Sequence, residues 1–411
     1  MNTTWYIAKR IAFNKQKTFS RFIIRLSVAA TAISVAAMII TICFVNGFQK
    51  AVSEKVFNFW GNIRVQHLAL DKSLIAEESV IERNDTVENT LKNNSAIAYF
   101  QPFATKSAVL KKGQEIEGVL LKGIDKTYDS LQLKKFIVKG RWLHFNDSSY
   151  SKEIILSEAI ANELNLNLND TATLFFISPN NQSTYRKVLI AAIYKTGIEE
   201  YDKLFAITDL KLLQRVSNLN ANKIGGYEIM LKHNNNGEDT TVSKQLNAML
   251  PTVWGSRSIR EVYPNIFDWL EILNNNRAII FIVMSIVAII NLITCLLILV
   301  LERTRMIGIL KSVGITDNAL QKLFLYYAGL IALKGTSIGV LIGLGICILQ
   351  QTTGIITLNE ANYYISYAPV QIIWWQVGSI VLATIIVCIT ALILPALIVT
   401  TIKPVKAIQF R

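Results

Sequence analysis

The residues able to do chemistry in this sequence do not form the pattern of a known catalytic site. The chain has no P-loop G-x-x-x-x-G-K-[ST], no G-x-S-x-G nucleophile turn, no dinucleotide-binding glycine loop, and no zinc-binding pair such as C-x-x-C or H-E-x-x-H. His67, His144 and His233 are far apart in the chain, so we expect ordinary surface or core histidines. The sequence therefore predicts a non-catalytic protein with no bound metal or cofactor, in which any energy from ATP comes from another chain.

The segment that points most clearly to a function is ERTRMIGILKSVG at residues 302–314. Ile307, Leu310 and Val313 recur there at helical spacing, and charged residues surround them. Such a short amphipathic helix suits insertion into a groove of a partner protein. A basic helix that anchors a loop to the membrane surface has the same pattern, so spacing alone leaves both interpretations open.

Four long apolar stretches must position this segment. The composition is 52% hydrophobic and only 17% charged, which is too apolar for an ordinary soluble chain. Each stretch reaches the roughly 20 residues that a helix needs to cross the hydrocarbon core of a bilayer. We therefore predict four transmembrane helices, in the stretches 26–46, 278–301, 323–349 and 370–402.

The net charge of +13 is concentrated in three short segments. Residues 1–25 carry six basic and no acidic residues, residues 302–322 carry four basic and two acidic residues, and residues 403–411 carry three basic residues. Residues 49–276 are nearly neutral, which argues against a nucleic-acid-binding domain. The positive-inside rule then places the three basic segments in the cytoplasm and residues 49–276 outside.

The N-terminal residues 1–25 mix aromatic and basic side chains. This mixture is typical of an amphipathic elbow helix in the inner headgroup layer. A basic region before an apolar one is also the pattern of a cleaved signal peptide, but the apolar run here is longer than a usual signal-peptide core. We therefore expect a retained first helix.

Three glycines stand four residues apart in the third apolar stretch: Gly335, Gly339 and Gly343. Because lipid provides no hydrophobic drive between helices, close approach along such a stripe favours helix packing. Lys334 lies beside the stripe, where a charge is costly unless it reaches the interface or a cavity. The sequence does not assign a role to Lys334.

Residues 49–276 are expected to form an α+β domain. Alternation predicts strands near both ends and in the middle of this region, at 62–67, 119–124, 154–157, 172–177, 187–193 and 227–231, and short helices at 87–93, 158–164 and 241–250. A strand followed by a helix at each end indicates one subdomain built from both ends, with residues 105–215 inserted. All four cysteines lie in the apolar stretches, so this domain must fold without disulfides.

ERTRMIGILKSVGI resembles the coupling segment of the FtsX/MacB superfamily of ABC permeases. YIAKRIAFNKQKTF, VNGFQKAVSEKVFNFWGNIRV, VLLKGID, IILSEAIANELNLNLND, TGIEEYDKLFAITDLKLLQ and PALIVTTIKPVKAIQFR are similar to segments of its lipoprotein-releasing LolC/LolE group, so the resemblance covers nearly the whole chain. Met306 departs from the pattern, because the family often has an acidic residue there. Lys334 also departs from it, because an apolar residue is usual.

The resemblance implies a type VII ABC permease, an α-helical membrane protein with four transmembrane helices and a large extracytoplasmic α+β domain. Its expected divisions are an elbow 1–25, spans 26–48, 277–301, 323–350 and 370–402, a coupling loop 302–322, a short outer loop 351–369, a tail 403–411, and an outer domain 49–276. Within that domain the resemblance implies a porter-like part at 49–104 and 216–262, an inserted part at 105–215 and a stalk at 263–276.

The resemblance also implies partners and sites. An ATPase dimer using ATP and Mg²⁺ would push on the coupling residues Glu302, Arg303, Arg305, Ile307, Ile309, Leu310, Lys311 and Gly314. A second permease, identical or related, a lipoprotein cargo and a periplasmic carrier complete the expected system, in the inner membrane with both termini cytoplasmic. Candidate residues facing lipid or cargo are Phe44, Phe48, Phe267, Leu270 and Leu273, although ordinary packing between helices explains each of them equally well.

Other functions, inside and outside the superfamily, stay open. Within the superfamily, the chain could be a MacB-like exporter or an FtsX-like activator of a cell-wall hydrolase, although the outer domain of hydrolase activators is smaller. A ligand-binding receptor of another class predicts a cytoplasmic signalling module, but the longest predicted cytoplasmic segment has only 25 residues. A membrane enzyme is disfavoured because no paired catalytic residues occur in the apolar stretches.

Overall fold

The structure is a computed structural model that describes residues 19–68, 80–147, 149–177, 183–232 and 237–396. His233, most of the predicted elbow and the whole predicted tail lie outside these residues. The chain divides into two compact units. We call residues 1–50, 270–357 and 367–411 the helical unit, and residues 51–269 and 358–366 the α+β unit.

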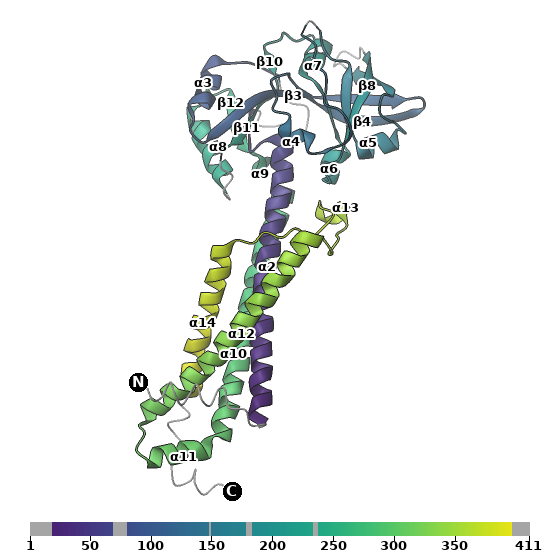
Figure 1. Cartoon of the computed structure of the whole chain (residues 1–411). Helices are drawn as coiled ribbons and strands as arrows, with labels where there is room; N and C mark the ends of the chain where they lie inside the picture. Colours follow the sequence, from purple (N-terminus) through teal and green to yellow (C-terminus); the bar gives the residue numbers. More distant parts are fainter. Residues whose placement is uncertain (1–18, 69–79, 148, 178–182, 233–236, 397–411) are drawn as a thin grey trace. The chain divides into compact units, whose positions relative to one another are not determined.

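Four of the described helices are long and apolar enough to cross a membrane, which agrees with the prediction of four transmembrane helices (Figure 1). They are α2 (Phe19–Trp60), α10 (Pro264–Glu302), α12 (Asp317–Thr353) and α14 (Trp374–Ala396). The short helix α11 (Thr304–Ser312) connects α10 to α12. Helices α2 and α10 are longer than the predicted spans, and the segment expected to form a stalk, 263–276, is helical from Pro264 onward and continuous with α10.

Packing inside the helical unit combines two apolar clusters with polar contacts. One cluster joins α10, α11, α12 and α14, and the other joins α2, α12 and α14. Asn291 on α10 donates to the backbone carbonyl of Ser27 on α2 at 3.0 Å, and Asn46 on α2 donates to Gln376 on α14 at 2.5 Å. Interhelical hydrogen bonds of this kind hold membrane helices together where the hydrophobic effect does not.

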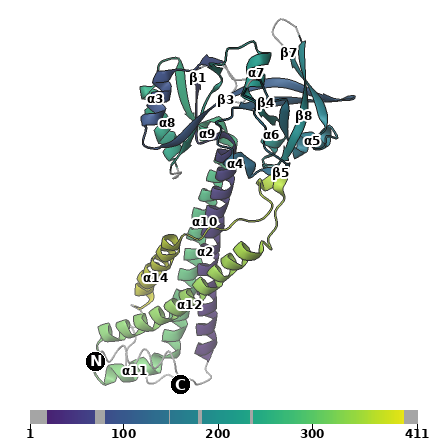
Figure 2. The ribbon, with the colours of Figure 1, turned by 45° about the horizontal axis from the view of Figure 1, so that its top comes forward.

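The α+β unit contains a ten-stranded mixed sheet (Figure 2). Its main path runs in the order β12, β1, β11, β3, β4, β9, β6, β8, β5, and β7 pairs with β3 and β8. The strands are β1 (Ile63–His67), β3 (Ile97–Lys112), β4 (Glu115–Ile124), β5 (Ile137–Gly140), β6 (Glu153–Ser157), β7 (Thr171–Ile177), β8 (Ser183–Tyr194), β9 (Phe205–Asp209), β11 (Gly226–Leu231) and β12 (Trp254–Ser258). A separate pair joins β2 (Ile81–Glu82) and β10 (Lys223–Ile224).

Short helices pack at both ends of this sheet. Figures 1 and 2 show α3 (Asp85–Asn93) and α8 (Glu238–Met249) beside the β12–β1 end, and α5 (Glu158–Glu163) beside β8. The remaining short helices are α4 (Leu131–Lys134), α6 (Glu199–Asp202), α7 (Leu210–Val216), α9 (Ile259–Val262) and α13 (Glu360–Tyr363). Every strand and helix predicted for this region is present.

The structure differs from the expected insertion in one respect. The end-built part and the inserted part have separate apolar cores, but the long strand β3 runs through both. Ala104, in the middle of β3, packs against both cores. The two parts therefore share one continuous sheet, which couples them mechanically.

Candidate functional site

Helix α11 is separated from α10 by a single residue, Arg303, whose φ of −100° and ψ of 14° interrupt the helix. The Thr304 hydroxyl donates to the Leu301 carbonyl at 2.7 Å and thereby satisfies one of the last carbonyls of α10. The end of α10 and the start of α11 are therefore only one residue apart.

The C-terminus of α11 is capped by a glycine turn. Gly314 adopts a φ of +94°, which only glycine takes without strain. The Gly314 N–H bonds to the Lys311 carbonyl at 3.0 Å and the Ile315 N–H to the Leu310 carbonyl at 3.1 Å, the two bonds of a Schellman motif. Lys311 also pairs with Asp317 at the start of α12, at 2.7 Å. These hydrogen bonds and the ion pair therefore fix the turn from α11 into α12.

The inner face of α11 packs against other helices of the same chain. Ile307 is 0% exposed and joins the cluster that also contains Leu299 of α10 and Phe324 of α12. Leu310 packs against the same cluster, as does Met306, the departure from the family pattern. Our expectation that Ile307 and Leu310 insert into a partner is thus corrected for Ile307 and weakened for Leu310, because spacing shows only that one face is apolar.

The outer face of α11 is available to another molecule. Ile309 is 49% exposed and Val313 77% exposed, and Arg305 and Ser312 lie on the same side at helical spacing. Of the other predicted coupling residues, Glu302 and Gly314 are exposed, whereas Arg303 and Lys311 are partly buried. Val313, which the spacing placed in the apolar face but the resemblance did not name as a coupling residue, is the most exposed apolar side chain of this segment.

The three predicted packing glycines lie against α2. A Cβ atom on Gly335 would meet Thr31 at 2.8 Å, one on Gly339 the Ala32 carbonyl oxygen at 2.6 Å, and one on Gly343 the Ile39 side chain at 3.1 Å. The contacts advance together along both helices, so α2 and α12 run parallel along this stripe.

Adding a methyl group at the centre of the stripe should therefore force α2 and α12 apart. We expect Gly339→Ala to lower the free energy of unfolding of the helical unit by about 1 to 3 kcal/mol, as in other overpacked cores. Gly345→Ala is the matched control, since the same atom there meets nothing within 4 Å. Thermal unfolding in detergent measures both, and equal losses of stability would contradict the packing.

The residues predicted to face lipid or cargo fall into two groups. Phe44, Phe48 and Leu273 are partly exposed. Phe267 and Leu270 are buried, at 7% and 4% exposure, and Phe267 packs against Phe57 with a ring separation of 5.7 Å. These two side chains therefore do not face lipid in this structure, which corrects the expectation.

Helix α10 presents an exposed apolar face that the sequence did not single out. Its members are between 45% and 61% exposed: Ile272, Ile279, Ile282, Val283, Ile286, Val287 and Ile290. Apart from Ile272, these residues lie in the almost wholly apolar stretch 278–301, where no polar face contrasts with such a stripe, so the sequence contains no signal for it.

In the α+β unit, the end of α2 is joined directly to the sheet. Only Gly61 and Asn62 separate α2 from β1, and Gly61, at a φ of +74°, passes so close to β11 that a Cβ would lie 2.8 Å from the Ile229 carbonyl oxygen. The Asn62 N–H donates to that same carbonyl at 2.8 Å. The end of α2 therefore has little freedom to move independently of the sheet.

The strand next to β1 leads into α10. β12 pairs with β1 along its length, and only α9 and Tyr263 lie between β12 and α10. The two long helices that reach the α+β unit are thus attached to neighbouring strands.

Aromatic packing fixes the last turn of α2. Trp60 is fully buried, and the Arg64 guanidinium lies over its ring at 3.7 Å from the centroid. Phe59 stacks on Tyr201, and Trp60 meets Phe205 edge to face at 4.9 Å. Such contacts add to the free energy of burial and make the junction between α2 and the sheet stiff.

A buried cation caps this helix end. Lys122 of β4 donates to the Phe59 carbonyl and forms an ion pair with Glu228 of β11 at 2.7 Å, both side chains being essentially inaccessible to solvent. The Tyr128 hydroxyl donates to the other Glu228 oxygen at 2.8 Å. Burial lowers the pKa of Lys122 to about 8, against the opposing effect of Glu228. A positive charge at a helix C-terminus also interacts favourably with the helix dipole.

The predicted short outer loop is tied to the same unit. Lys55 donates to the Thr196 and Tyr364 carbonyls at 2.6 Å each, and Lys195 pairs with Glu360 at 2.8 Å. The sequence indicated no role for this loop, because such contacts depend on the tertiary fold.

The comparisons with known proteins agree with this architecture. The MacB-like periplasmic core domain matches residues 26–249, and the FtsX-like permease C-terminal domain matches residues 278–404. Lipoprotein-releasing system transmembrane protein LolE of Haemophilus influenzae is 22% identical over 100% of both chains. The corresponding protein LolC of Neisseria meningitidis is 23% identical over 99% of this chain and 98% of its own.

Among solved structures, the periplasmic region of MacB from Actinobacillus actinomycetemcomitans is similar over 50% of this chain and 92% of that chain, with 15% identity and a TM-score of 0.34. Four candidate spans, a large α+β unit and a short helix between the second and third spans are the architecture of a multi-pass membrane protein. The chain belongs to the FtsX/MacB family of ABC-transporter permeases, with a MacB-like periplasmic core domain and an FtsX-like C-terminal domain.

Proposed function

We propose that this chain is the non-catalytic permease subunit of an ATP-driven complex that releases lipoproteins from the inner membrane. The observation that carries the proposal is similarity along the whole chain to relatives named as lipoprotein-releasing transmembrane proteins. An exporter of the MacB type is expected to share the periplasmic core domain, but the relatives found at full length carry the lipoprotein-releasing name.

In the proposed topology, both termini and the α11 loop are cytoplasmic and the α+β unit is periplasmic. The support for it is the distribution of basic residues, which are in excess in the first 25 residues, in residues 302–322 and in the last nine residues. This orientation brings the outer face of α11 to the side where ATP is available.

The mechanism is transmission of force rather than passage of cargo through the chain. A separate ATPase dimer binds ATP and Mg²⁺, and its closure displaces α11 through Arg305, Ile309 and Val313. The displacement passes into α10 across Arg303 and reaches β12, while α2 is fastened to the neighbouring strand β1. A second permease, identical or related, completes the complex and contacts exposed apolar faces such as that of α10.

The cargo is a protein with acyl chains in the outer leaflet. Extracting those chains costs about 0.8 kcal/mol for each CH₂ group exposed to water, so an energy source is required. Phe44, Phe48 and Leu273 are partly exposed apolar residues toward the outer ends of α2 and α10, where such chains would enter. A periplasmic carrier then receives the acylated protein.

Photocrosslinking tests this function in the intact complex. A photoreactive amino acid at Phe48 or Leu273 should capture a protein that incorporates radiolabelled palmitate, and capture should fall when ATP is hydrolysed. The same group at Ile386, which is 52% exposed on α14, is the control for random contact with lipid-anchored proteins. Equal capture at Ile386, or capture of only small molecules at Phe48, would reject lipoprotein release and favour an exporter.

A further inference from the structure

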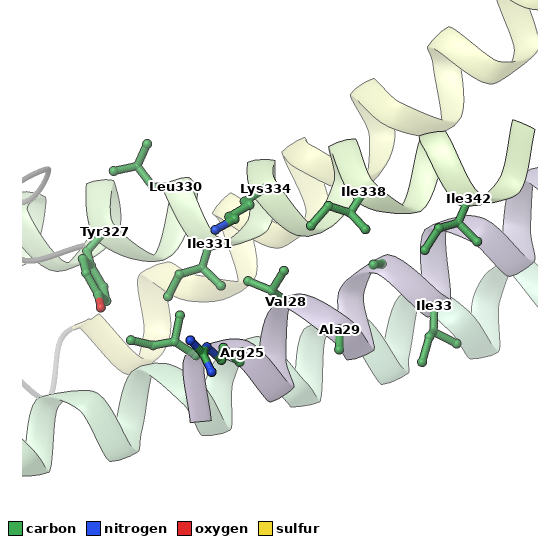
Figure 3. Close-up of a pocket in the computed structure, with 12 residues that line it drawn as sticks. Arg25, Val28, Ala29, Ile33, Tyr327, Leu330, Ile331, Lys334, Ile338 and Ile342 are labelled. Atoms are coloured by element: carbon green, nitrogen blue, oxygen red, sulfur yellow. The ribbon is translucent and has the colours of Figure 1, made fainter. Parts of the chain in front are cut away.

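A groove of about 430 Å³ lies between α2 and α12 of the helical unit (Figure 3). Its walls are mostly apolar, with Ile33, Ile338 and Ile342 along one stretch. Arg25 and Lys334 lie toward the other end, near Tyr327, and the Lys334 ammonium group points toward that end. The groove thus combines an apolar length with a cationic end.

The two charges are not balanced within the helical unit. Among the residues that the structure describes, neither Arg25 nor Lys334 has an ion pair with an acidic side chain, and both side chains are exposed. The apolar spans of all four membrane helices contain no aspartate or glutamate. Lys334 lies within the predicted apolar span 323–349, where a cation is costly unless an anion or the interface satisfies it, and an anion from outside the chain would satisfy both Lys334 and Arg25.

Charge argues against two protein occupants. The N-terminal segment of this chain carries Lys9, Arg10, Lys15 and Lys17 and no acidic residue before Glu54, so it would add positive charge to the groove. A second copy placed with the same face against this one would bring Arg25 and Lys334 against their own counterparts. Neither occupant neutralises the site.

An amphiphile with one anionic group and a long apolar tail matches both parts of the groove. The guanidinium group of Arg25 suits bidentate bonding to phosphate oxygens, and lysine binds phosphate as a point charge. Basic pockets between membrane helices on the cytoplasmic side are known to bind anionic headgroups. In the proposed topology α2 and α12 both begin at the cytoplasmic side, so this cationic end lies in the inner leaflet.

We propose that the groove binds one anionic glycerophospholipid of the cytoplasmic leaflet. Its phosphate lies between Arg25 and Lys334, and one acyl chain runs along Ile33, Ile338 and Ile342. Bound there, the lipid lies beside Gly335 and Gly339, where α2 and α12 are in closest contact, and it stabilises that pair of helices. This site is independent of the cargo and of the ATPase, so it stands whatever the transported molecule is.

Lipid titration of the delipidated, purified full-length chain tests the site. We expect phosphatidylglycerol, but not phosphatidylcholine, to remain bound in native mass spectrometry and to raise the unfolding temperature. Arg25→Gln and Lys334→Gln should each weaken phosphatidylglycerol binding about fivefold, and together about 25-fold, as expected for the loss of one and two cation contacts. Lys322→Gln is the matched control, an exposed cation of α12 outside the groove, and should leave binding unchanged.

Two further variants separate a lipid from other occupants. Ala29→Phe fills the apolar wall while keeping both charges, so it should abolish lipid binding, and Arg25→Lys should restore most of the affinity lost in Arg25→Gln. Equal binding of the two lipids by the wild type, or undiminished binding by the double variant, would overturn the proposal. Competition by inorganic phosphate combined with full binding by Ala29→Phe would show a simple anion site and overturn it as well.

Discussion

Replacing Ile309 and Val313 together by aspartate should remove the ATPase from the purified permease. Both side chains are exposed on the outer face of α11, at 49% and 77%. Each would bury an apolar group worth about 1.5 to 3 kcal/mol in a partner's groove, and a carboxylate there carries a further desolvation cost. We therefore expect the affinity for the ATPase to fall at least 100-fold, measured by copurification and by titration with the isolated ATPase.

Two matched variants show whether this loss is specific. Asn318→Asp adds a carboxylate to the first turn of α12, outside α11, and it should leave ATPase binding intact. Ile307→Asp places the carboxylate in the chain's own core, so it should lower the stability of the helical unit as well as binding. Full ATPase binding by the Ile309 and Val313 double variant would exclude the outer face of α11 as the contact.

Replacing Lys122 by methionine should produce the largest loss of stability in the α+β unit. The substitution removes the ion-pair partner 2.7 Å from Glu228, which is 1% exposed, and leaves that carboxylate with the Tyr128 hydroxyl and its cross-strand neighbour Arg64. Breaking a buried ion pair by removing one partner typically costs 3–5 kcal/mol, so we expect a loss of about that size. Hydrogen exchange of the β4 and β11 amides in the full-length chain measures this opening free energy.

The double variant Lys122→Met with Glu228→Gln separates charge from packing. Without the carboxylate, the penalty of an unpaired buried charge disappears, so most of the lost protection should return. Lys126→Met is the surface control, because the Lys126–Asp147 pair is solvent-exposed, and it should leave protection unchanged. A double variant as unstable as the single one would show that the ion pair is not what stabilises the contact between β4 and the end of α2.

The four membrane helices could be predicted because length and hydrophobicity alone determine whether a helix can cross a bilayer. The strands with clear alternation of apolar and polar residues, such as 62–67 and 227–231, could also be predicted from the sequence. Six of the described strands were not predicted: β2, β3, β5, β9, β10 and β12. In β9 all five residues are buried, so the alternation is absent, and β12 (WGSRS) has only Trp254 as a strong apolar signal.

Strand β3 shows a different obstacle to prediction. It contains Pro102, a residue that usually marks the edge of a sheet, yet it lies between β11 and β4. Its burial pattern also changes along its 16 residues, because it serves two apolar cores in turn. The sequence indicated a division at this point, whereas the tertiary structure joins the two parts.

For the site, the sequence located α11 but did not orient it. The spacing of Ile307, Leu310 and Val313 defines an apolar face, but only the positions of α10 and α12 show that Ile307 faces inward and Val313 outward. The burial of Phe267 and Leu270 could not be predicted from the sequence for the same reason. The groove at Arg25 and Lys334 brings together residues more than 300 positions apart, so the unexplained lysine was its only sequence signal.

The most direct test of the account is the side of the membrane on which α11 lies. All four native cysteines are buried, so a new cysteine at Val313 or at Leu131, on α4 of the α+β unit, is the main target for a membrane-impermeant maleimide. We expect Leu131→Cys to react in intact spheroplasts and Val313→Cys to react only after the membrane is permeabilised. Reaction of Val313→Cys from outside in intact spheroplasts would contradict coupling to a cytoplasmic ATPase.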